Sequence, residues 1–515
     1  MSTNFTALDF IVLVSYLVGT TALGVWLGRD QKDAKDYFVA GKTIPWWAIL
    51  FSVVATETSA LTFISIPGLA YVTNLGFLQL ATGYLLGRIV VAYTLLPKYY
   101  QGDLVTAYAL LEQRFGLATR RFASIVFMGT RALADSVRVF ATAIPIALII
   151  GPVLPQQYVM PAAILVLGVL TLFYTYHGGM RAVVWTDVLQ TAVYISGGVA
   201  AVYILGKVVT GGWGAIFADA NAAGKLRIFD FYLGFDRPLT LFAGVLGGAF
   251  LSMASHGADQ LIVQRLLASS SLKDARKALI GSGFAVIVQF SLFLMIGLGL
   301  WTFYGQREFA VPDSIFPTFV VTQMPAGLRG LIIAAVLAAA MSSLSGSMNS
   351  LAAATTHDIY LPLSGRTPTD PRTLRMGKRF TLFWGLLLLT AALLYRQQGT
   401  PVVVVALSIA SFTYGGLLGG FFLGMLWRRA IQRDAILGMA TAILIMTFVV
   451  FARQLAPIFP AFHETFTSLS RIAWPWYVLI GTTITMIVGM LSSLTHPARI
   501  GGDRWNAMPQ APHEP

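Results

Sequence analysis

Hydroxyl and carboxylate side chains gather in the middle of an apolar stretch, residues 46–71. The stretch is long enough to cross a bilayer, yet its centre reads Ala55-Thr-Glu-Thr-Ser-Ala-Leu-Thr62, and it then reaches Pro67 and Gly68. Polar groups at membrane depth are costly unless they face protein, water or an ion. We therefore expect a discontinuous helix whose unwound carbonyls and hydroxyls face a bound ion and a solute. The alternative is a helix whose hydroxyls bond back to its own carbonyls, which Glu57 disfavours.

Asp187 is a second polar group inside an apolar stretch, residues 182–208. A carboxylate in such surroundings is either protonated or neutralised by a cation. Na⁺ is one candidate for that cation, and a salt bridge to Arg181 is the alternative.

The stretch 327–356 contains Ser342, Ser345 and Asn349, which lie three and four positions apart and so share one helix face. Hard cations such as Na⁺ bind oxygen ligands, which this face offers beside small residues. A plain interface between closely packed helices is the alternative. This alternative explains why the stretch is rich in alanine. It does not explain why the stretch carries so many hydroxyl side chains.

Arg131, Asp135 and Arg138 form one charged stripe within residues 122–151. One interpretation is a triad whose charges satisfy each other. The other is that Arg138 meets a substrate carboxylate with its planar guanidinium.

Residues 239–258 are again polar and interrupted by glycine, with Ser252, Ser255 and His256 near their end. Broken segments at matching positions in two halves of a chain point to a binding site at the middle of the membrane. We expect these three side chains to line that site.

The composition excludes a soluble or disordered class. Of 515 residues, 56% are hydrophobic and 11% charged, and the mean hydropathy is +0.72. The absence of cysteine excludes disulfides, cysteine zinc sites and thiol catalysis. The net charge of +13 comes from basic loops between apolar segments, so we expect no nucleic-acid partner. The first stretch, 8–28, lacks a basic leader and a small-residue cleavage site, which predicts a retained span.

A membrane span needs about 20 apolar residues, and on that rule the sequence predicts an all-α polytopic membrane protein. The thirteen predicted spans are 8–28, 46–71, 77–96, 122–151, 158–176, 182–208, 239–258, 279–304, 327–356, 379–396, 401–427, 435–454 and 473–494. Residues 105–115 have the pattern of an interfacial helix. The tail, 495–515, has the composition of a disordered segment, and the whole chain reads as one transmembrane domain.

The distribution of basic residues predicts the orientation. With the amino terminus outside, 23 of the 35 Lys and Arg lie in cytoplasmic loops and the tail, and 9 lie on the opposite side. The remaining three, Arg88, Arg131 and Arg138, lie within spans. This bias predicts an outside amino terminus and a cytoplasmic carboxyl terminus, in a cell (inner or plasma) membrane.

Three motifs together resemble the sodium:solute symporter family over roughly the second to the eleventh span. They are Gly178-Gly179 through Asp187-Val-Leu-Gln190, Asp259-Gln-Leu-Ile-Val-Gln264-Arg265, and Ser342-Ser343-Leu-Ser345 followed by Asn349-Ser350 and Asp358-Ile-Tyr360. The resemblance implies a LeuT-like core of two inverted five-helix repeats. Here these would be residues 46–208 and 239–427, with 8–28 as an additional first helix and 435–494 as two further helices.

The resemblance also implies the sodium ligands. They are the carbonyls of Ala55, Thr58 and Ala339 and the hydroxyls of Ser342 and Ser343. A second sodium site, found in some members, would correspond to Asp187, Ser342 and Ser345. Gly346 stands where those members offer another hydroxyl.

The substrate residues implied by the resemblance are of the sialic acid type. Ser59, Thr62, Gln79 and Arg138 are similar to the set of sialic acid transporters. Ser255 and His256 replace the aromatic pair of sugar-transporting members, and Ser252 precedes them. Glu57 has no counterpart in that set, and we expect it to meet an amino group or to pair with Arg138.

The predicted function is sodium-coupled symport of a small polar organic solute that carries a carboxylate, by alternating access. The alternatives are proton coupling through Glu57, Asp187 or His256, and sodium-coupled sugar transport. The chain shows no cluster of catalytic carboxylates or histidines, so we do not expect an enzyme. The expected partners are Na⁺ as coupling ion, the solute and the lipid bilayer, with no other cofactor and no obligate protein partner.

Overall fold

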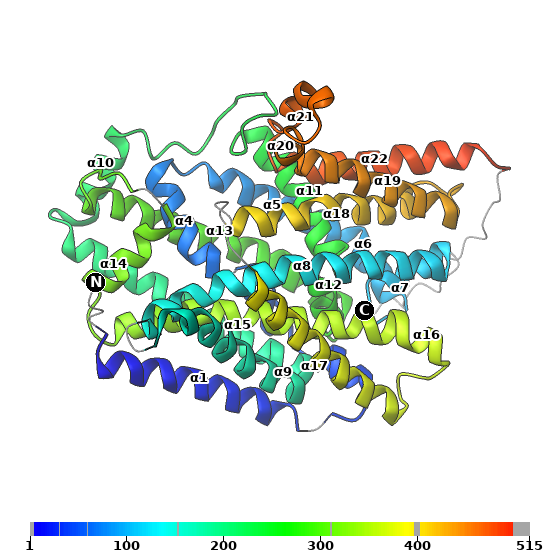
Figure 1. The fold of residues 1–515 in the computed structure, drawn as a ribbon, viewed down its shortest axis with the longest axis horizontal. Coiled ribbons are helices and arrows are strands. Elements are labelled where there is room, and N and C mark those ends of the chain that lie inside the picture. Colours follow the sequence, from blue (N-terminus) through cyan, green and yellow to red (C-terminus); the bar gives the residue numbers. More distant parts are fainter. Residues whose placement is uncertain are drawn as a thin grey trace.

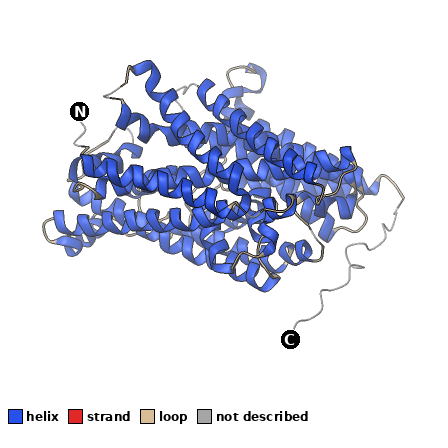
Figure 2. Ribbon diagram, turned by 90° about the horizontal axis from the view of Figure 1, so that it is seen from below, coloured by secondary structure: helices blue, strands red, loops and turns tan. Residues whose placement is uncertain are grey.

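The computed structural model describes residues 5–497 except positions 30, 59, 103, 152–153, 310–311 and 396–401. Among the helical residues, the side chains at 60–61, 144–145, 148–149, 402–408 and 410–412 are not described. The described residues form helices joined by loops, the longest over residues 223–242, and contain no named strand (Figure 2). The fold class predicted from the sequence is therefore confirmed as all-helical.

The helices follow each other in a simple order along the chain. Those of the first half are α1 Ala7–Leu27, α2 Ala34–Val39, η1 Ala40–Lys42, α3 Trp46–Glu57, α4 Ala60–Val72, α5 Phe77–Tyr93, α6 Leu95–Tyr100, α7 Tyr108–Phe115, α8 Leu117–Ile150, α9 Gln156–Val208 and α10 Gly212–Ala222.

The second half begins with a π-helical turn, η2. Its helices are η2 Ala243–Gly247, α11 Gly248–Gly257, α12 Gln260–Leu267, α13 Leu272–Phe303, η3 Pro312–Ser314, α14 Ile315–Gln323, α15 Leu328–Ala354, η4 Thr355–Tyr360, α16 Leu361–Ser364, α17 Pro371–Leu394, α18 Val402–Leu426, α19 Gln432–Val450, α20 Ala452–Leu455, η5 Pro460–Phe462, α21 His463–Leu469 and α22 Trp476–Leu494.

Helix α15 is the centre of the bundle. Every residue from Ile332 to Ala354 is buried, and the helix packs against α9, α1, α8 and α17. Its sequence is rich in Ala, Ser and Gly, which lets the neighbouring backbones approach closely. The long helices run roughly side by side along the longest axis of the molecule, with α1 on the outside (Figure 1).

The predicted discontinuous helix is present. Helix α3 ends at Glu57, Thr58 has extended backbone angles (φ −84°, ψ 96°), and α4 begins at Ala60. The two segments are bent by 62°. The break lies at the hydroxyl cluster, whereas Pro67 lies inside α4.

Helix α9 contains a second interruption, at Gly179. This residue has φ 53° and ψ −152°, and an added Cβ would lie 2.5 Å from the carbonyl oxygen of Tyr37. A straight helix of 53 residues would be about 80 Å long, more than twice the hydrocarbon thickness of about 30 Å. The interruption therefore divides α9 into two segments, each of about the length that one span needs.

Helices lie over all thirteen predicted ranges. Eight helices of the described residues are long and apolar enough to cross a membrane, and the bent pair of α3 and α4 would be a ninth. The count of thirteen spans, the domain limits and the orientation stay predictions. The helix predicted over 105–115 is present as α7, and residues beyond 497 lie outside the described part.

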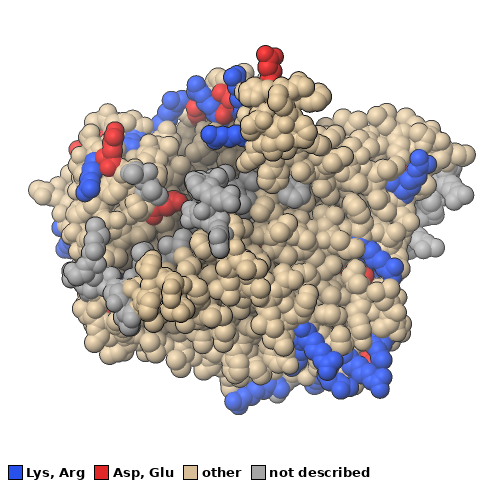
Figure 3. Space-filling view, viewed as in Figure 1, with Lys and Arg blue, Asp and Glu red and all other residues tan. Residues whose placement is uncertain are grey.

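The surface agrees with a membrane environment. The face drawn in Figure 3 is mostly uncharged, with Lys and Arg gathered near its rim. Large apolar side chains such as Ile11, Val169 and Val288 are more than half exposed on α1, α9 and α13. A bilayer would cover such side chains.

We expect Gly179→Ala to destabilise the protein. An alanine at this backbone conformation costs about 1–3 kcal/mol, and its Cβ would collide with the Tyr37 carbonyl. The measurement is the melting temperature of the purified protein in detergent. Gly19→Ala in α1 is the matched control, because an added Cβ there meets nothing within 4 Å. Equal melting temperatures for the two variants would contradict the role given to Gly179.

Candidate functional site

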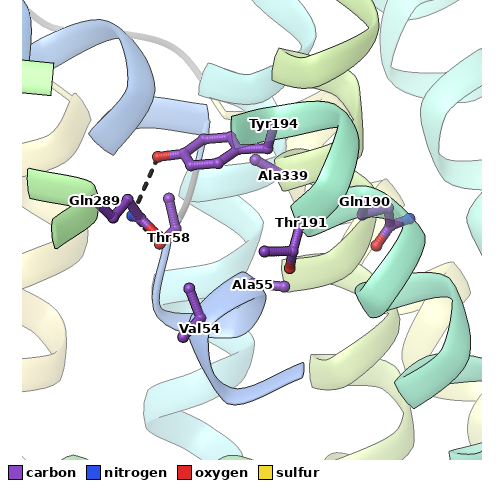
Figure 4. Close-up of a pocket in the computed structure, with 8 residues that line it drawn as sticks. All are labelled: Val54, Ala55, Thr58, Gln190, Thr191, Tyr194, Gln289 and Ala339. Atoms are coloured by element: carbon purple, nitrogen blue, oxygen red, sulfur yellow. Dashed lines mark hydrogen bonds between the residues drawn. The ribbon is translucent and has the colours of Figure 1, made fainter. Parts of the chain in front are cut away.

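The break between α3 and α4 borders a small cavity, with room for about one water molecule or ion. Residues of four helices and of the break line it: Val54, Ala55, Thr58, Gln190, Thr191, Tyr194, Gln289 and Ala339 (Figure 4). The last carbonyls of a helix have no partner within the helix and carry its negative dipole end. Because α3 ends beside this cavity, its carboxyl-terminal end favours a cation there.

Gln289 of α13 and Tyr194 of α9 complete the polar wall of this cavity. Gln289 Nε2 donates to Thr58 Oγ1 at 2.5 Å and to the Tyr194 hydroxyl at 3.3 Å (Figure 4). Sequence reasoning missed both residues. The signal for Gln289 was a single amide in the otherwise apolar centre of the stretch 279–304.

The predicted sodium ligands on α15 adjoin the cavity through Ala339. Ser343 Oγ donates to the Ala339 carbonyl at 3.1 Å, and Ser342 Oγ donates to Asp187 Oδ1 at 2.6 Å. A hydroxyl that donates its hydrogen keeps its lone pairs, so both oxygens can still accept a cation. The structure thus brings Ala55, Thr58 and Ala339 to one cavity, whose lining does not include the two serines.

Asp187 is fully buried and pairs with Arg265 of α12. Asp187 Oδ2 lies 3.2 Å from Arg265 Nη2 and accepts from Ser52 Oγ at 2.5 Å. Of the two interpretations drawn from the sequence, a salt bridge is present, but its partner is Arg265 and not Arg181. The side chain of Arg181 is exposed.

Glu57 forms an ion pair with Arg88 of α5, not with Arg138. Arg88 is fully buried, and its Nη1 donates to Ser282 Oγ at 2.8 Å. Glu57 keeps 16% of its side chain exposed, so this carboxylate can meet a ligand from the accessible side. The expected pairing of Glu57 with Arg138 is therefore wrong.

His256 faces the same carboxylate. Its Nε2 lies 3.8 Å from Glu57 Oε2 and has no hydrogen-bond partner among the described residues. Its Nδ1 lies 2.8 Å from Ser255 Oγ and 3.2 Å from the Ser252 carbonyl. Because Ser255 Oγ itself donates to that carbonyl, Nδ1 is the donor and Nε2 is left as an acceptor.

In the charged stripe of α8, Asp135 lies at ion-pair distance from both arginines, 3.5 Å from Arg131, so the predicted triad is present, but it is not closed. Arg131 donates to Asp259 Oδ2 at 2.6 Å and to the Tyr414 hydroxyl at 2.8 Å, both on other elements. Arg138 lies 3.2 Å from Asp135 and keeps 19% of its side chain exposed. This leaves Arg138 with a single ion-pair partner in the described part of the chain and with access to a solute.

Comparison with known proteins decides the family. Residues 37–442 match the model of the sodium:solute symporter family. The chain belongs to the sodium:solute symporter family. It is therefore a multi-pass membrane protein that couples to Na⁺ and carries a small organic solute.

Relatives of this symporter over nearly its full length are transporters. It is 32% identical to the sodium/sialic acid symporter NanT of Aliivibrio fischeri, covering 95% of this chain and 94% of the relative. It is 31% identical to the sodium/sialic acid symporter SiaT of Proteus mirabilis, covering 86% and 89%. A solved substrate-bound, outward-open Na⁺-coupled sialic acid symporter superposes with a TM-score of 0.83 at 28% identity, over 96% of this chain and 99% of that one.

The remaining predicted solute residues of this symporter are scattered around the site. Gln79 bonds to the backbone of Gly76, Asp230 and Leu239, and thereby fixes the segment before η2 to α5. Ser252 Oγ donates to the Tyr84 carbonyl at 2.9 Å. Thr62 is partly buried near the start of α4. Ser59 lies outside the described residues, and the roles of all these side chains stay predictions.

We expect the Glu57–Arg88 pair to show strong coupling in a double-mutant cycle. Glu57→Gln leaves a buried guanidinium without its counter-ion, so the double variant with Arg88→Met should lose less stability than the sum of the two single variants, by about 1–3 kcal/mol. Thermal unfolding of the four proteins in detergent measures the difference. The partly exposed pair Arg366 and Asp370 is the control, for which we expect a coupling below about 1 kcal/mol. If the stability losses of the two single variants simply added up in the double variant, Glu57 and Arg88 would not be energetically coupled.

Proposed function

We propose that this symporter uses the inward movement of Na⁺ to take up a small solute that carries a carboxylate, of the sialic acid type. The observation that carries the proposal is the open carboxyl-terminal end of α3 beside Ala339. Three of the five predicted ligands lie around one cavity there. The sialic acid symporters among the relatives support the class of solute.

The sodium site we propose is formed by the carbonyls of Ala55, Thr58 and Ala339 and the hydroxyls of Ser342 and Ser343. All five ligands are neutral oxygens, which suit a hard cation. The hydrogen bond from Ser342 to Asp187 fixes the orientation of that hydroxyl and makes its oxygen a better electron donor. Asp187 thus supports the ion through Ser342.

The solute site we propose combines Arg138 with the group around Glu57. Arg138 offers a planar guanidinium to a carboxylate, and within the described residues its one ion-pair partner is Asp135, which it shares with Arg131. Glu57 and the acceptor Nε2 of His256 match donors on the solute, such as hydroxyl or amide N–H groups. Ser252, Ser255, Thr62, Gln79 and Ser59 complete the set predicted from the sequence.

The mechanism we propose is alternating access between two inverted repeats, with the amino terminus outside. Na⁺ joins α3 to α15 and thereby stabilises the state that is open to the outside. Solute binding closes the outer path, and loss of Na⁺ to the cytoplasm releases the contact between the two helices. A membrane potential supplies about 2.3 kcal/mol per net charge moved per 100 mV, and a monoanionic solute cancels the charge of one Na⁺.

Proton coupling is a second candidate, because His256 Nε2 lies 3.8 Å from Glu57 without a hydrogen-bond partner among the described residues. Replacing Na⁺ with choline at constant pH distinguishes sodium coupling from proton coupling. We expect uptake of N-acetylneuraminate into proteoliposomes to stop in choline. Undiminished uptake in choline would instead favour proton coupling.

Ser343→Ala should raise the Na⁺ concentration for half-maximal uptake by about tenfold or more, since it removes one oxygen ligand, and about 1.4 kcal/mol corresponds to tenfold. Uptake of N-acetylneuraminate at varied Na⁺ measures this. Ser270→Ala is the control, because its Oγ bonds to Asp274 near the start of α13. A similar response of both variants would count against the sodium site.

Arg138→Lys should reduce the apparent affinity for N-acetylneuraminate by at least about tenfold, while Na⁺ dependence is retained. Lysine keeps the charge but loses the two-pronged geometry that matches a carboxylate. Binding and uptake assays on the purified variant test this. The control is Arg366→Lys. Arg366 pairs with Asp370 in the loop between α16 and α17. Unchanged affinity of the Arg138 variant would remove this arginine from the solute site.

A further inference from the structure

We infer that Asp9 of α1 is a positioning residue for transport, because it holds the amino-terminal end of α15 in place. The inference rests on the proposed sodium symport, in which α15 carries three of the ligands. Helix α1 lies on the outside of the bundle and outside the two predicted repeats (Figure 1). The contact through Asp9 gives this additional helix a part in ion binding.

Asp9 is the one acidic residue of α1, and its side chain is fully buried. Most of the helix is not: Ile11 and Trp26, for example, are each 61% exposed. The buried residues of α1 form a narrow stripe, namely Asp9, Leu13, Thr20 and Gly24. A carboxylate in a membrane segment is costly unless it has partners inside the protein. Its place on this stripe therefore needs specific partners.

The partners of Asp9 are the first backbone N–H groups of α15. Helix α15 has no side-chain cap of its own, because its N-cap residue is Gly327. Asp9 Oδ1 accepts from Gly327 N at 2.8 Å and from Gly330 N at 2.9 Å. Gly330 is the third residue of α15, whose N–H an N-cap side chain ordinarily takes. Asp9 thus caps α15 from another helix, and its charge matches the positive end of the helix dipole.

The same carboxylate also fixes the start of α1. Its Oδ2 accepts from Thr6 N at 3.0 Å and from Thr6 Oγ1 at 2.9 Å, which completes a capping box. Arg329 Nη1 lies 3.9 Å from this oxygen. A Cβ added to Gly330 would lie 2.7 Å from Asp9 Cα, so the two backbones touch here. One side chain therefore joins the ends of two helices at a close contact.

The other end of α1 is held at the break in α9. A Cβ added to Gly28 would collide with Gly178 Cα, next to the interruption. Tyr174 of α9 packs against Gly24 and donates its hydroxyl to the Met341 carbonyl of α15 at 3.3 Å. Because its far end is fixed in this way, α1 gives Asp9 a firm position from which to hold α15.

A displacement at the capped end of α15 would reach the proposed sodium ligands. The helix is continuous from Leu328 to Ala354, so Ala339 lies about 14 Å and Ser343 about 20 Å along its axis from Gly330. The ligands on α3 are held by other contacts, the ion pair of Glu57 among them. A binding site must keep its geometry to within about 0.5 Å. A shift of α15 relative to α3 would therefore weaken Na⁺ binding.

The test is the substitution Asp9→Asn, which replaces one of the two acceptor oxygens with an N–H₂ group. We expect the dissociation constant for Na⁺ to rise by about fivefold, the equivalent of one lost helix cap. Equilibrium binding of ²²Na⁺ to the purified protein in detergent measures this. At saturating Na⁺, the N-acetylneuraminate concentration for half-maximal uptake should stay within about twofold of the wild-type value, since the solute residues are not on α15.

Two control variants separate positioning from stability. Leu13→Ala truncates a side chain one turn further along the buried stripe and leaves the cap in place. Thr6→Ala removes a donor to Oδ2 but keeps both bonds from Asp9 to α15. We expect both to bind Na⁺ like the wild type even where their melting temperatures fall. Na⁺ affinities that fall in all three variants in proportion to the melting temperature, or an unchanged affinity in Asp9→Asn, would overturn the inference.

Gly330→Ala tests the same contact from the other helix, because its Cβ would push α15 away from Asp9. We expect a loss of Na⁺ affinity in the same direction, and a folded variant with wild-type affinity would contradict the role of this contact. This variant decides if Asp9→Asn cannot be purified. A wild-type protein that binds no Na⁺ at all would instead overturn the proposed function.

Discussion

The open end of helix α3 is the feature on which the rest of the site depends. Within a membrane, backbone groups must find partners inside the protein or on a ligand, because lipid offers none. The break at Thr58 leaves helix-end carbonyls beside a cavity that is closed by Gln289, Tyr194 and Ala339. Among the described residues, Gln289 Oε1 has no hydrogen-bond partner there. The cation that we propose at this site would join α3 to α15 and would thus be both cargo and a structural link.

The buried charges form pairs that connect different elements. Glu57 of α3 pairs with Arg88 of α5, and Asp187 of α9 pairs with Arg265 of α12. Arg131 of α8 likewise pairs with Asp259 at the start of α12. Buried ion pairs add little net stability, but breaking one is costly, so each fixes which helices must stay together. Helices joined in this way would move as units when the access path changes.

The sequence was sufficient to locate the broken helix and the oxygen-rich face of α15, because both are signalled by polar residues where hydrocarbon requires apolar ones. It was not sufficient to choose partners for the charges. Glu57 and Arg88 are 31 positions apart, Asp187 and Arg265 are 78 apart, and Arg131 and Asp259 are 128 apart. Such contacts follow from the packing of whole helices, which spacing within one helix cannot reveal. The two pairings that we considered, Asp187 with Arg181 and Glu57 with Arg138, were wrong for this reason.

The pairing of Asp187 with Arg265 also bears on how the ion is released. With the aspartate neutralised, the proposed sodium ligands carry no net charge, and the ion is held by dipoles of carbonyls and hydroxyls alone. A site with an uncompensated carboxylate would bind Na⁺ more tightly and give it up more slowly. A transporter must release its ion in every cycle, so moderate affinity is an advantage. The fixed guanidinium therefore lets Asp187 orient Ser342 without adding its full charge to the sodium site.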